Sequence, residues 1–125
     1  MNTSRQAIGV DIVEIQRIKL AVTRWEDTFL KRIYSDAELE YCGKMYGSLA
    51  ARFAAKEAVI KTLGAAAKGL SWREIEILHG ENEAPYVKLH GNTLKQAEKL
   101  GLTEVSISMS HCKEYAIALS VAHAV

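Results

Sequence analysis

Two carboxylates in different predicted elements are candidates for metal chemistry. Asp11 lies in a segment of alternating residues, 7–15, which predicts a β-strand with Asp11 on the face opposite Val10 and Ile12. Glu57 lies in an alanine-rich segment, 48–63, which is the strongest helix signal in the chain. Mg²⁺ usually keeps several waters and takes one or two protein carboxylates together with substrate phosphates. One carboxylate from a strand and one from a helix are therefore enough to hold it.

Each carboxylate also has a plainer explanation. A buried, unpaired carboxylate is costly, so the alternative for Asp11 is an edge strand that lets it face water. Glu57 and Lys61 are four residues apart, so the alternative for Glu57 is an ordinary ion pair along the helix, worth about 0.2–0.5 kcal/mol. The spacing alone leaves these alternatives open.

Three cations surround Glu57 on the same predicted helix: Arg52, Lys56 and Lys61. Lys56 falls inside the apolar stripe, so its side chain must either extend to solvent or meet an anion. Arg52 and Lys61 are suited to phosphate oxygens, which Lys and Arg bind through charge-assisted hydrogen bonds. The helix therefore carries the groups that phosphate chemistry needs.

Two further features have both a functional and a plain interpretation. His111 ends a predicted strand, where it is either a solvated turn residue or a phosphate contact or proton-transfer group. Arg17, Lys19 and Arg24 fall in residues 15–25, a segment without an acid. This segment is either an ordinary solvated helix or a basic patch that steers an acidic partner.

Composition limits the class of protein. The 125 residues have a net charge of +1, with 49% apolar and 25% charged residues, as in an ordinary globular domain. We therefore expect one domain over residues 1–125. The near-neutral charge argues against non-specific nucleic-acid binding, and there is no run of about eighteen apolar residues for a transmembrane helix. A chain this short is expected to build a wide ligand site between subunits.

The cellular location is predicted from the cysteines and the first residues. Cys42 and Cys112 are too few for a disulfide scaffold and lack the spacing of zinc ligands. The start of the chain is polar and then carries Asp11, which is unlike a secretory signal. We expect reduced thiols in a cytoplasmic protein without a membrane segment.

Helical periodicity dominates the first half of the chain. From residue 15 the apolar residues recur at three and four, and a second short helical stretch holds Phe29 and Ile33. Ser35 and Glu38 match a capping box that opens a helix over residues 36–42. Gly43 and Gly47 interrupt that helix, and residues 65–70 are a connection after the helix 48–63. The expected apolar stripes consist of Ile15, Ile18, Val22 and Trp25, and of Leu49, Phe53, Ile60 and Leu63.

The last third is mostly alternating. It predicts strands over residues 72–78, 84–90, 105–110 and 115–121, and a helix over 92–100 that ends at Gly101. Residues 111–114 form a polar connector between the last two strands, which predicts a hairpin. The predicted fold class is α+β: an antiparallel β-sheet packed against one long α-helix, with shorter helices.

Four segments together resemble one enzyme family. Residues 9–15 (GVDIVEI, with Arg17 after them), 52–61 (RFAAKEAVIK), 85–91 (PYVKLHG) and 106–111 (SISMSH, followed by Tyr115 and Ala116) are similar to signatures of holo-acyl-carrier-protein synthases, the small trimeric 4′-phosphopantetheinyl transferases. The four occur in the family's order and span nearly the whole chain.

The resemblance implies a reaction and roles for individual residues. The family transfers the 4′-phosphopantetheine arm of coenzyme A to a serine of apo acyl carrier protein, for fatty acid biosynthesis. Asp11 and Glu57 would be the Mg²⁺ ligands, Lys61 would bind a phosphate oxygen, and Glu57 would accept the serine proton directly or through a water. The resemblance also implies that Arg52, Lys61, Pro85 and His111 line the coenzyme A site, and that Arg17, Lys19 and Arg24 contact the carrier protein.

Other functions are compatible with parts of the pattern. The main alternative is a non-catalytic nucleotide- or coenzyme-binding α+β module, which would need a phosphate pocket but not two metal carboxylates. A general phosphohydrolase would require a positioned water and usually more acids. The homotrimer is implied by the resemblance alone.

Overall fold

The computed structural model describes residues 5–64, 69–82 and 84–124. Most of the predicted connection over 65–70 lies outside these residues. The elements follow one another as β1 (Arg5–Glu14), α1 (Ile15–Ile33), α2 (Asp36–Cys42), α3 (Tyr46–Thr62), the short 3₁₀-helix η1 (Trp72–Glu74), β2 (Ile75–His79), β3 (Pro85–Leu89), α4 (Gly91–Leu100), β4 (Leu102–His111) and β5 (Tyr115–Ala124).

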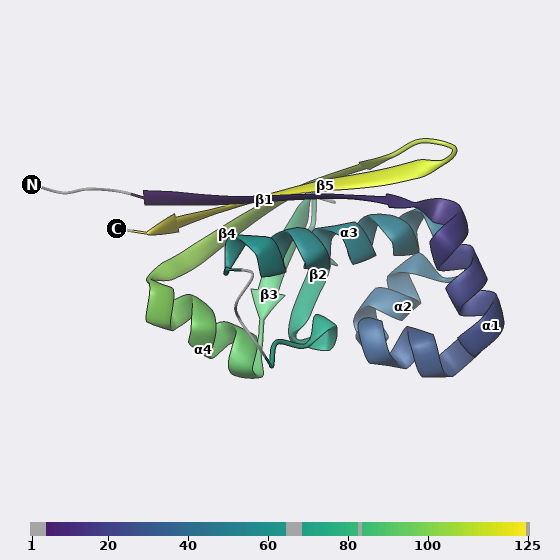
Figure 1. Cartoon of the computed structure of the whole chain (residues 1–125), viewed down its shortest axis with the longest axis horizontal. Coiled ribbons are helices and arrows are strands. Elements are labelled where there is room, and N and C mark those ends of the chain that lie inside the picture. The colour runs from purple at the N-terminus through teal and green to yellow at the C-terminus, as the bar shows by residue number, and fades with distance from the viewer. Residues whose placement is uncertain (1–4, 65–68, 83, 125) are drawn as a thin grey trace, which may run out of the picture.

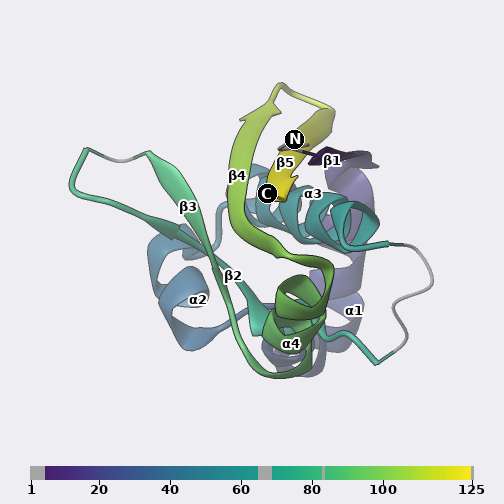
Figure 2. The same cartoon turned by 90° about the vertical axis from the view of Figure 1, so that its left-hand side faces the viewer.

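The strands form two antiparallel sheets rather than the single sheet predicted. One sheet has the order β1-β5-β4, and the other is the β2-β3 hairpin. Helix α3 runs beneath the three-stranded sheet, and α1, α2 and α4 lie on the far side of α3 (Figure 1). The β2-β3 hairpin extends outward past α2 (Figure 2). The α+β class is confirmed, and so is the hairpin between β4 and β5.

Helix α3 can lie close to the sheet because both surfaces are built from small residues. Its buried face carries Ala50, Ala51, Ala54, Ala55 and Ala58, and the facing positions of β5 are alanines and a serine. This corrects half of the predicted stripe on α3, since Leu49 and Leu63 are buried but Phe53 and Ile60 are only half-buried. The larger side chains lie at the flanks because the contact has room only for methyl groups.

The closest approach occurs at Gly9 of β1. A Cβ atom at this position would lie 2.0 Å from the carbonyl oxygen of Ala58 and 2.7 Å from Oγ1 of Thr62. Real Cβ atoms do not come so close to a backbone oxygen, so only glycine fits here. The contact places the residues that follow Gly9 on β1 beside those that precede Ala58 on α3.

The alternation predicted for β1 is correct, and it decides which side chains of the strand face α3. Gly9 and Val13 are buried beneath the sheet, whereas Ile8, Val10 and Ile12 point outward and are at least half-exposed. Asp11 shares the inner face with Gly9 and Val13. The strand lies at a sheet edge, which agrees with one part of the alternative given for Asp11. The other part is wrong, because Asp11 faces α3 rather than open water.

Helix α1 is interrupted, which corrects the expected position of Trp25. Glu26 has a φ of 46° and a ψ of −127°, so the helical backbone breaks between the two apolar stretches that the sequence indicated. Ile18 and Ile33 are buried on either side of this break. Trp25 is 54% exposed, because it directly precedes the break and turns away from the core.

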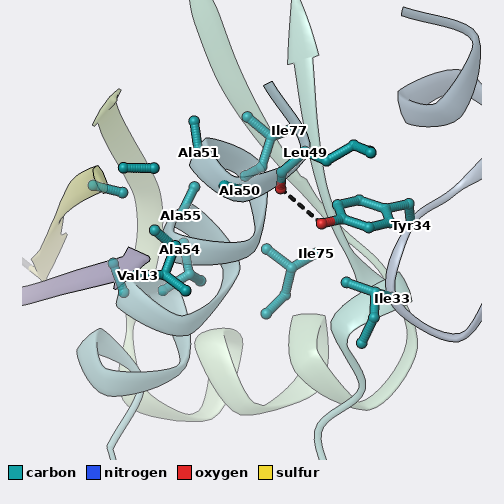
Figure 3. Packing of buried hydrophobic residues seen from close by; sticks show 14 of the residues in the cluster. Val13, Ile33, Tyr34, Leu49, Ala50, Ala51, Ala54, Ala55, Ile75 and Ile77 are labelled. Carbon is teal, nitrogen blue, oxygen red and sulfur yellow. Dashed lines mark hydrogen bonds between the residues drawn. The ribbon is translucent and has the colours of Figure 1, made fainter. Parts of the chain in front are cut away.

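The same core continues from α3 to the end of α1 and to β2. Ile33, Tyr34, Leu49, Ile75 and Ile77 pack together, and the Tyr34 hydroxyl donates to the Leu49 carbonyl at 2.7 Å (Figure 3). Burial is the main reason that the pKa of Tyr34 is raised far above its ordinary value. The phenol therefore stays a neutral donor, and this hydrogen bond anchors the start of α3.

The capping box is confirmed, and its glutamate has an additional role. Ser35 Oγ accepts from the Glu38 N–H, and Glu38 Oε1 accepts from the Ser35 N–H. Glu38 is fully buried and also accepts from Lys56 Nζ at 2.6 Å and from the Ile77 N–H at 3.1 Å. Lys56 thus meets an anion, which was one of the two outcomes expected. Burial lowers the pKa of Lys56, and the charge of Glu38 opposes that effect.

Gly9→Ala tests the close contact. The added methyl group collides with backbone rather than with a flexible side chain, so the free energy of unfolding should fall by at least about 3 kcal/mol. Chemical denaturation measures this. Gly80→Ala is the matched control, because the nearest atom to a Cβ there is 3.5 Å away. Equal unfolding midpoints for the two variants would contradict the contact.

Candidate functional site

Asp11 and Glu57 line the same pocket. The pocket has a volume of about 260 Å³ and lies between β1, α1 and α3. Arg17 also lines it, and Phe29 and Phe53 supply apolar walls. The two carboxylates that the sequence singled out are therefore brought together, and one cation of the predicted carrier-protein face lies beside them.

Asp11 is held by Lys61. The Lys61 ammonium lies 3.0 Å from Asp11 Oδ1 and also donates to the Val10 carbonyl at 3.0 Å. The Asp11 side chain is 18% exposed and that of Lys61 51%. Lys61 therefore pairs with the strand and not with Glu57, so the simple ion pair along the helix was the wrong expectation. An ammonium has three donors, and the third can bind a phosphate oxygen.

Glu57 is held by a residue that the sequence analysis did not single out. The indole N–H of Trp72 donates to Glu57 Oε1 at 2.9 Å. Trp72 opens η1, and its ring lies against Phe53 with centroids 6.3 Å apart. A tryptophan near the start of a predicted strand gives no sequence signal for this contact, which joins segments fifteen residues apart.

The donor set suits a hard divalent cation. Within the described residues, a donor of the chain engages one oxygen of each carboxylate and leaves the second oxygen for another ligand. Within the part of the chain that the structure describes, no group of three or more His, Cys, Asp or Glu side chains could hold a metal. Two carboxylates are too few for a complete protein cage, but they fit an ion that keeps waters and binds substrate phosphates.

Arg52 occupies a second pocket. Its side chain is almost wholly buried, and Nη2 donates to His79 Nδ1 at 2.9 Å while the guanidinium lies 4.6 Å from the ring centroid of Tyr41. Tyr41 and His79 are themselves stacked, with centroids 4.1 Å apart. Among the described residues, Arg52 has no carboxylate partner, and its Nε has no hydrogen-bond acceptor. A buried cation without a carboxylate partner is suited to an incoming anion.

His111 lies at the same pocket as Arg52. Both line a cavity of about 180 Å³ together with Tyr41 and His79. The His111 ring rests on the first turn of α3, where a Cβ at Gly47 would lie 2.8 Å from Nε2. Gly47 lies inside α3, which begins at Tyr46, two residues before the predicted start of that helix. The glycine leaves the space that the His111 ring fills.

The four predicted coenzyme residues fall into separate places on one chain. Arg52 and His111 share the second pocket, and Pro85 opens β3 opposite His79, which lines that pocket. Lys61 lies instead with Asp11 at the first pocket. A single copy of the chain thus has two separate pockets, one with Arg52 and His111 and one with Asp11 beside Lys61.

The three cations of the predicted docking face are exposed on α1. The Lys19 ammonium lies 5.8 Å from the Tyr46 ring centroid, and the Arg24 guanidinium lies 4.9 Å from that of Trp25. Arg17, Lys19 and Arg24 have no salt bridge within the described residues. Leu20 and Trp25, both more than half-exposed, lie on the same helix. This surface is basic with apolar patches.

The comparison with protein families is decisive. The model of the 4′-phosphopantetheinyl transferase superfamily matches residues 7–120. The chain belongs to this superfamily. It is a phosphopantetheinyl transferase by sequence over nearly its whole length, which confirms the resemblance and the class of enzyme.

No helix within the described ranges has the length and apolar character needed to cross a membrane.

Individual relatives and solved structures agree with this assignment. The transferase is 53% identical over 114 residues to a holo-[acyl-carrier-protein] synthase of Dehalococcoides mccartyi, covering 91% of this chain and 95% of the relative. It is 42% identical over 120 residues to the protein of that name from Herpetosiphon aurantiacus, covering 90% and 94%. The structure of the Helicobacter pylori enzyme in complex with coenzyme A superposes with a TM-score of 0.83 at 35% identity, covering 92% and 98% of the two chains. The Neisseria meningitidis enzyme gives 0.84 at 36%, covering 93% and 96%.

Proposed function

We propose that this transferase is a holo-acyl-carrier-protein synthase. It moves the 4′-phosphopantetheine arm of coenzyme A to a serine hydroxyl of apo acyl carrier protein and releases adenosine 3′,5′-bisphosphate. The observation that carries the proposal is the shared pocket of Asp11 and Glu57, with Lys61 on one carboxylate and Trp72 on the other. The names of the relatives and the coenzyme A complex of the Helicobacter pylori enzyme support it.

The chemistry requires charge neutralisation and alignment more than a covalent intermediate. The serine oxygen attacks the phosphorus that bears the pantetheine arm, and the bond from this phosphorus to the bridging oxygen of the pyrophosphate breaks. Asp11 and Glu57 would hold Mg²⁺, which when bound supplies positive charge at the pyrophosphate. Lys61 adds a point charge on a phosphate oxygen. The Glu57 carboxylate takes the serine proton, and the adenosine bisphosphate leaves with the bridging oxygen.

The remaining coenzyme residues support a site shared between subunits. Arg52 and His111 at the second pocket, with Pro85 nearby, would bind the adenosine half of coenzyme A, and Lys61 its pyrophosphate. Coenzyme A is the substrate, and Mg²⁺ is the cofactor. The two regions are separate on one chain, so a neighbouring chain would bring its Arg52 and His111 to the Asp11 pocket.

The outer face of the three-stranded sheet supports a homotrimer. Ile8, Val10 and Ile12 of β1 lie beside Ile117 and Leu119 of β5, and all five are exposed. Serines 106, 108 and 110 of β4 continue this face. A contiguous apolar patch on a sheet face is typical of a protein interface. Three copies packed through this sheet face would bury the patch.

The carrier protein would dock on α1. Acyl carrier proteins are acidic, and Arg17, Lys19 and Arg24 give a basic helix on a protein whose net charge is close to zero.

We also assign the enzyme to the cytoplasm. Cys42 and Cys112 are both free thiols, which suits a reducing compartment.

The reaction is tested by mass spectrometry of apo acyl carrier protein mixed with the enzyme and coenzyme A. We expect a mass gain of one phosphopantetheine arm with Mg²⁺ and no gain with EDTA. Asp11→Asn and Glu57→Gln should each slow transfer by roughly two orders of magnitude or more, since this charge stabilisation is worth several kcal/mol. Asp36→Asn is the control, because that side chain is 93% exposed and does not line the pocket. Failure with several carrier proteins, together with coenzyme A binding, would favour the non-catalytic module.

The docking face is tested by charge reversal. Arg24→Glu should raise KM for the carrier protein roughly tenfold and leave KM for coenzyme A unchanged, because Arg24 lies on α1 outside the metal pocket. Lys99→Glu makes the same change in charge on α4, at the opposite end of the molecule from α1 (Figure 1), and should change neither constant. Equal effects of the two variants would exclude α1 as the docking face.

The trimer is tested by light scattering. Leu119→Glu should convert the assembly from the mass of three chains to that of one, because a carboxylate would be buried at the interface. Leu94→Glu is a matched control, since Leu94 on α4 is 42% exposed and Leu119 is 43% exposed. A wild-type monomer, or a trimeric Leu119→Glu protein, would contradict the sheet-face interface.

A further inference from the structure

We propose that Trp72 is a positioning residue for Glu57. Its indole N–H fixes Oε1 of the carboxylate, so that Oε2 is presented to the metal. The inference rests on the proposed function of the Asp11–Glu57 pocket. The hydrogen bond is 2.9 Å long, and it is the contact that restrains the Glu57 carboxylate within the described residues.

The chemistry of the two groups makes this contact directional. An indole has one N–H and no acceptor, and a carboxylate offers two oxygens with only acceptor sites. A donor fixed on Oε1 therefore limits rotation of the carboxylate and leaves the other oxygen for the cation. Removing a hydrogen-bond partner of a metal ligand typically weakens metal binding by about 10- to 100-fold.

Trp72 is itself held in place by the residue next to Glu57. The Trp72 carbonyl accepts from Lys56 Nζ at 2.9 Å. Lys56 is fully buried, and its ion pair with Glu38 is 2.6 Å long. Two consecutive residues of α3 thus hydrogen-bond to Trp72: Lys56 to its backbone carbonyl and Glu57 to its indole N–H. The Phe53 ring supports the indole from the side.

The two carboxylates of the pocket are restrained in the same way. Lys61 engages one oxygen of Asp11, and Trp72 engages one oxygen of Glu57. The difference is in charge, because Lys61 is a cation that can also reach phosphate, whereas the indole is neutral. A neutral donor orients Glu57 without competing electrostatically with the metal or removing its ability to accept a proton.

The test is direct binding of Mn²⁺ to the Trp72→Phe variant. The phenyl ring keeps the contact with Phe53, and the backbone carbonyl keeps its bond to Lys56, but the N–H donor is lost. Electron paramagnetic resonance of free Mn²⁺ should show roughly 10- to 100-fold weaker binding than in the wild type. Trp25→Phe removes the other tryptophan of the chain, which is exposed on α1, and should bind Mn²⁺ like the wild type.

A second measurement does not depend on the variant being stable. In the wild-type protein, the indole N–H resonances of Trp72 and Trp25 can be followed by NMR during addition of Mg²⁺, with Trp25→Phe used to assign them. The Trp72 resonance should shift and the Trp25 resonance should not. A folded Trp72→Phe protein with wild-type Mn²⁺ affinity, or an unmoved Trp72 resonance in an enzyme that binds Mg²⁺, overturns the inference. Wild-type protein that neither binds metal nor transfers the arm overturns the proposed function instead.

Discussion

The arrangement of the molecule depends on the direct contact between the backbone of β1 and helix α3. Gly9 has no side chain, and the helix presents alanines, so the strand and the helix approach to the limit set by backbone atoms. A contact of this kind fixes the register of strand against helix, since a shift by one residue would place a larger side chain in the gap. Asp11 and Glu57 share a pocket because this register is fixed.

The same constraint explains the outer surface of the sheet. Side chains alternate across a strand, so small residues on the inner face leave the large residues of β1 and β5 for the outer face. The buried positions of β5 are Ala116, Ala118, Ser120, Ala122 and Ala124, and the intervening large residues are exposed or half-buried. A sheet built to admit a helix closely therefore also presents an apolar outer face. The same pattern of residues builds the pocket and the exposed apolar face on which the proposed trimer depends.

The sequence predicted the elements well and their faces less well. Periodicity located β1, α2, α4 and the final hairpin, and the capping box at Ser35 defined the start of α2, because these signals depend on residues near one another in the chain. The buried face of α3 was predicted only in part: Leu49 and Leu63 are buried, but Phe53 and Ile60 are not, because alanines form the contact with the sheet. The division into two sheets and the exposure of Trp25 depend on tertiary packing and on the break at Glu26, neither of which has a local pattern.

The site residues that could be predicted are charged residues in otherwise apolar segments. The aromatic and histidine residues that contact them could not be predicted. Asp11 on an apolar strand, and Lys56 in an apolar stripe, were conspicuous because burial of charge is costly. Trp72, Tyr41 and His79 were not, because aromatic residues and a single histidine have many ordinary positions in a fold. Their roles follow only from which charged group each one contacts.

The two buried cations on α3 differ in the partners that surround them. Lys56 has a carboxylate and two backbone carbonyls, which satisfies an ammonium completely. Arg52, one helical turn earlier, has an imidazole nitrogen, a backbone carbonyl and a tyrosine face, and no carboxylate among the described residues. If stability were the only requirement, a buried guanidinium would be paired with an acid, because an uncompensated charge in the interior is strongly destabilising. These contacts hold the guanidinium at the same pocket as His111 and give it no carboxylate partner among the described residues, so an anion bound in this pocket would compensate its charge.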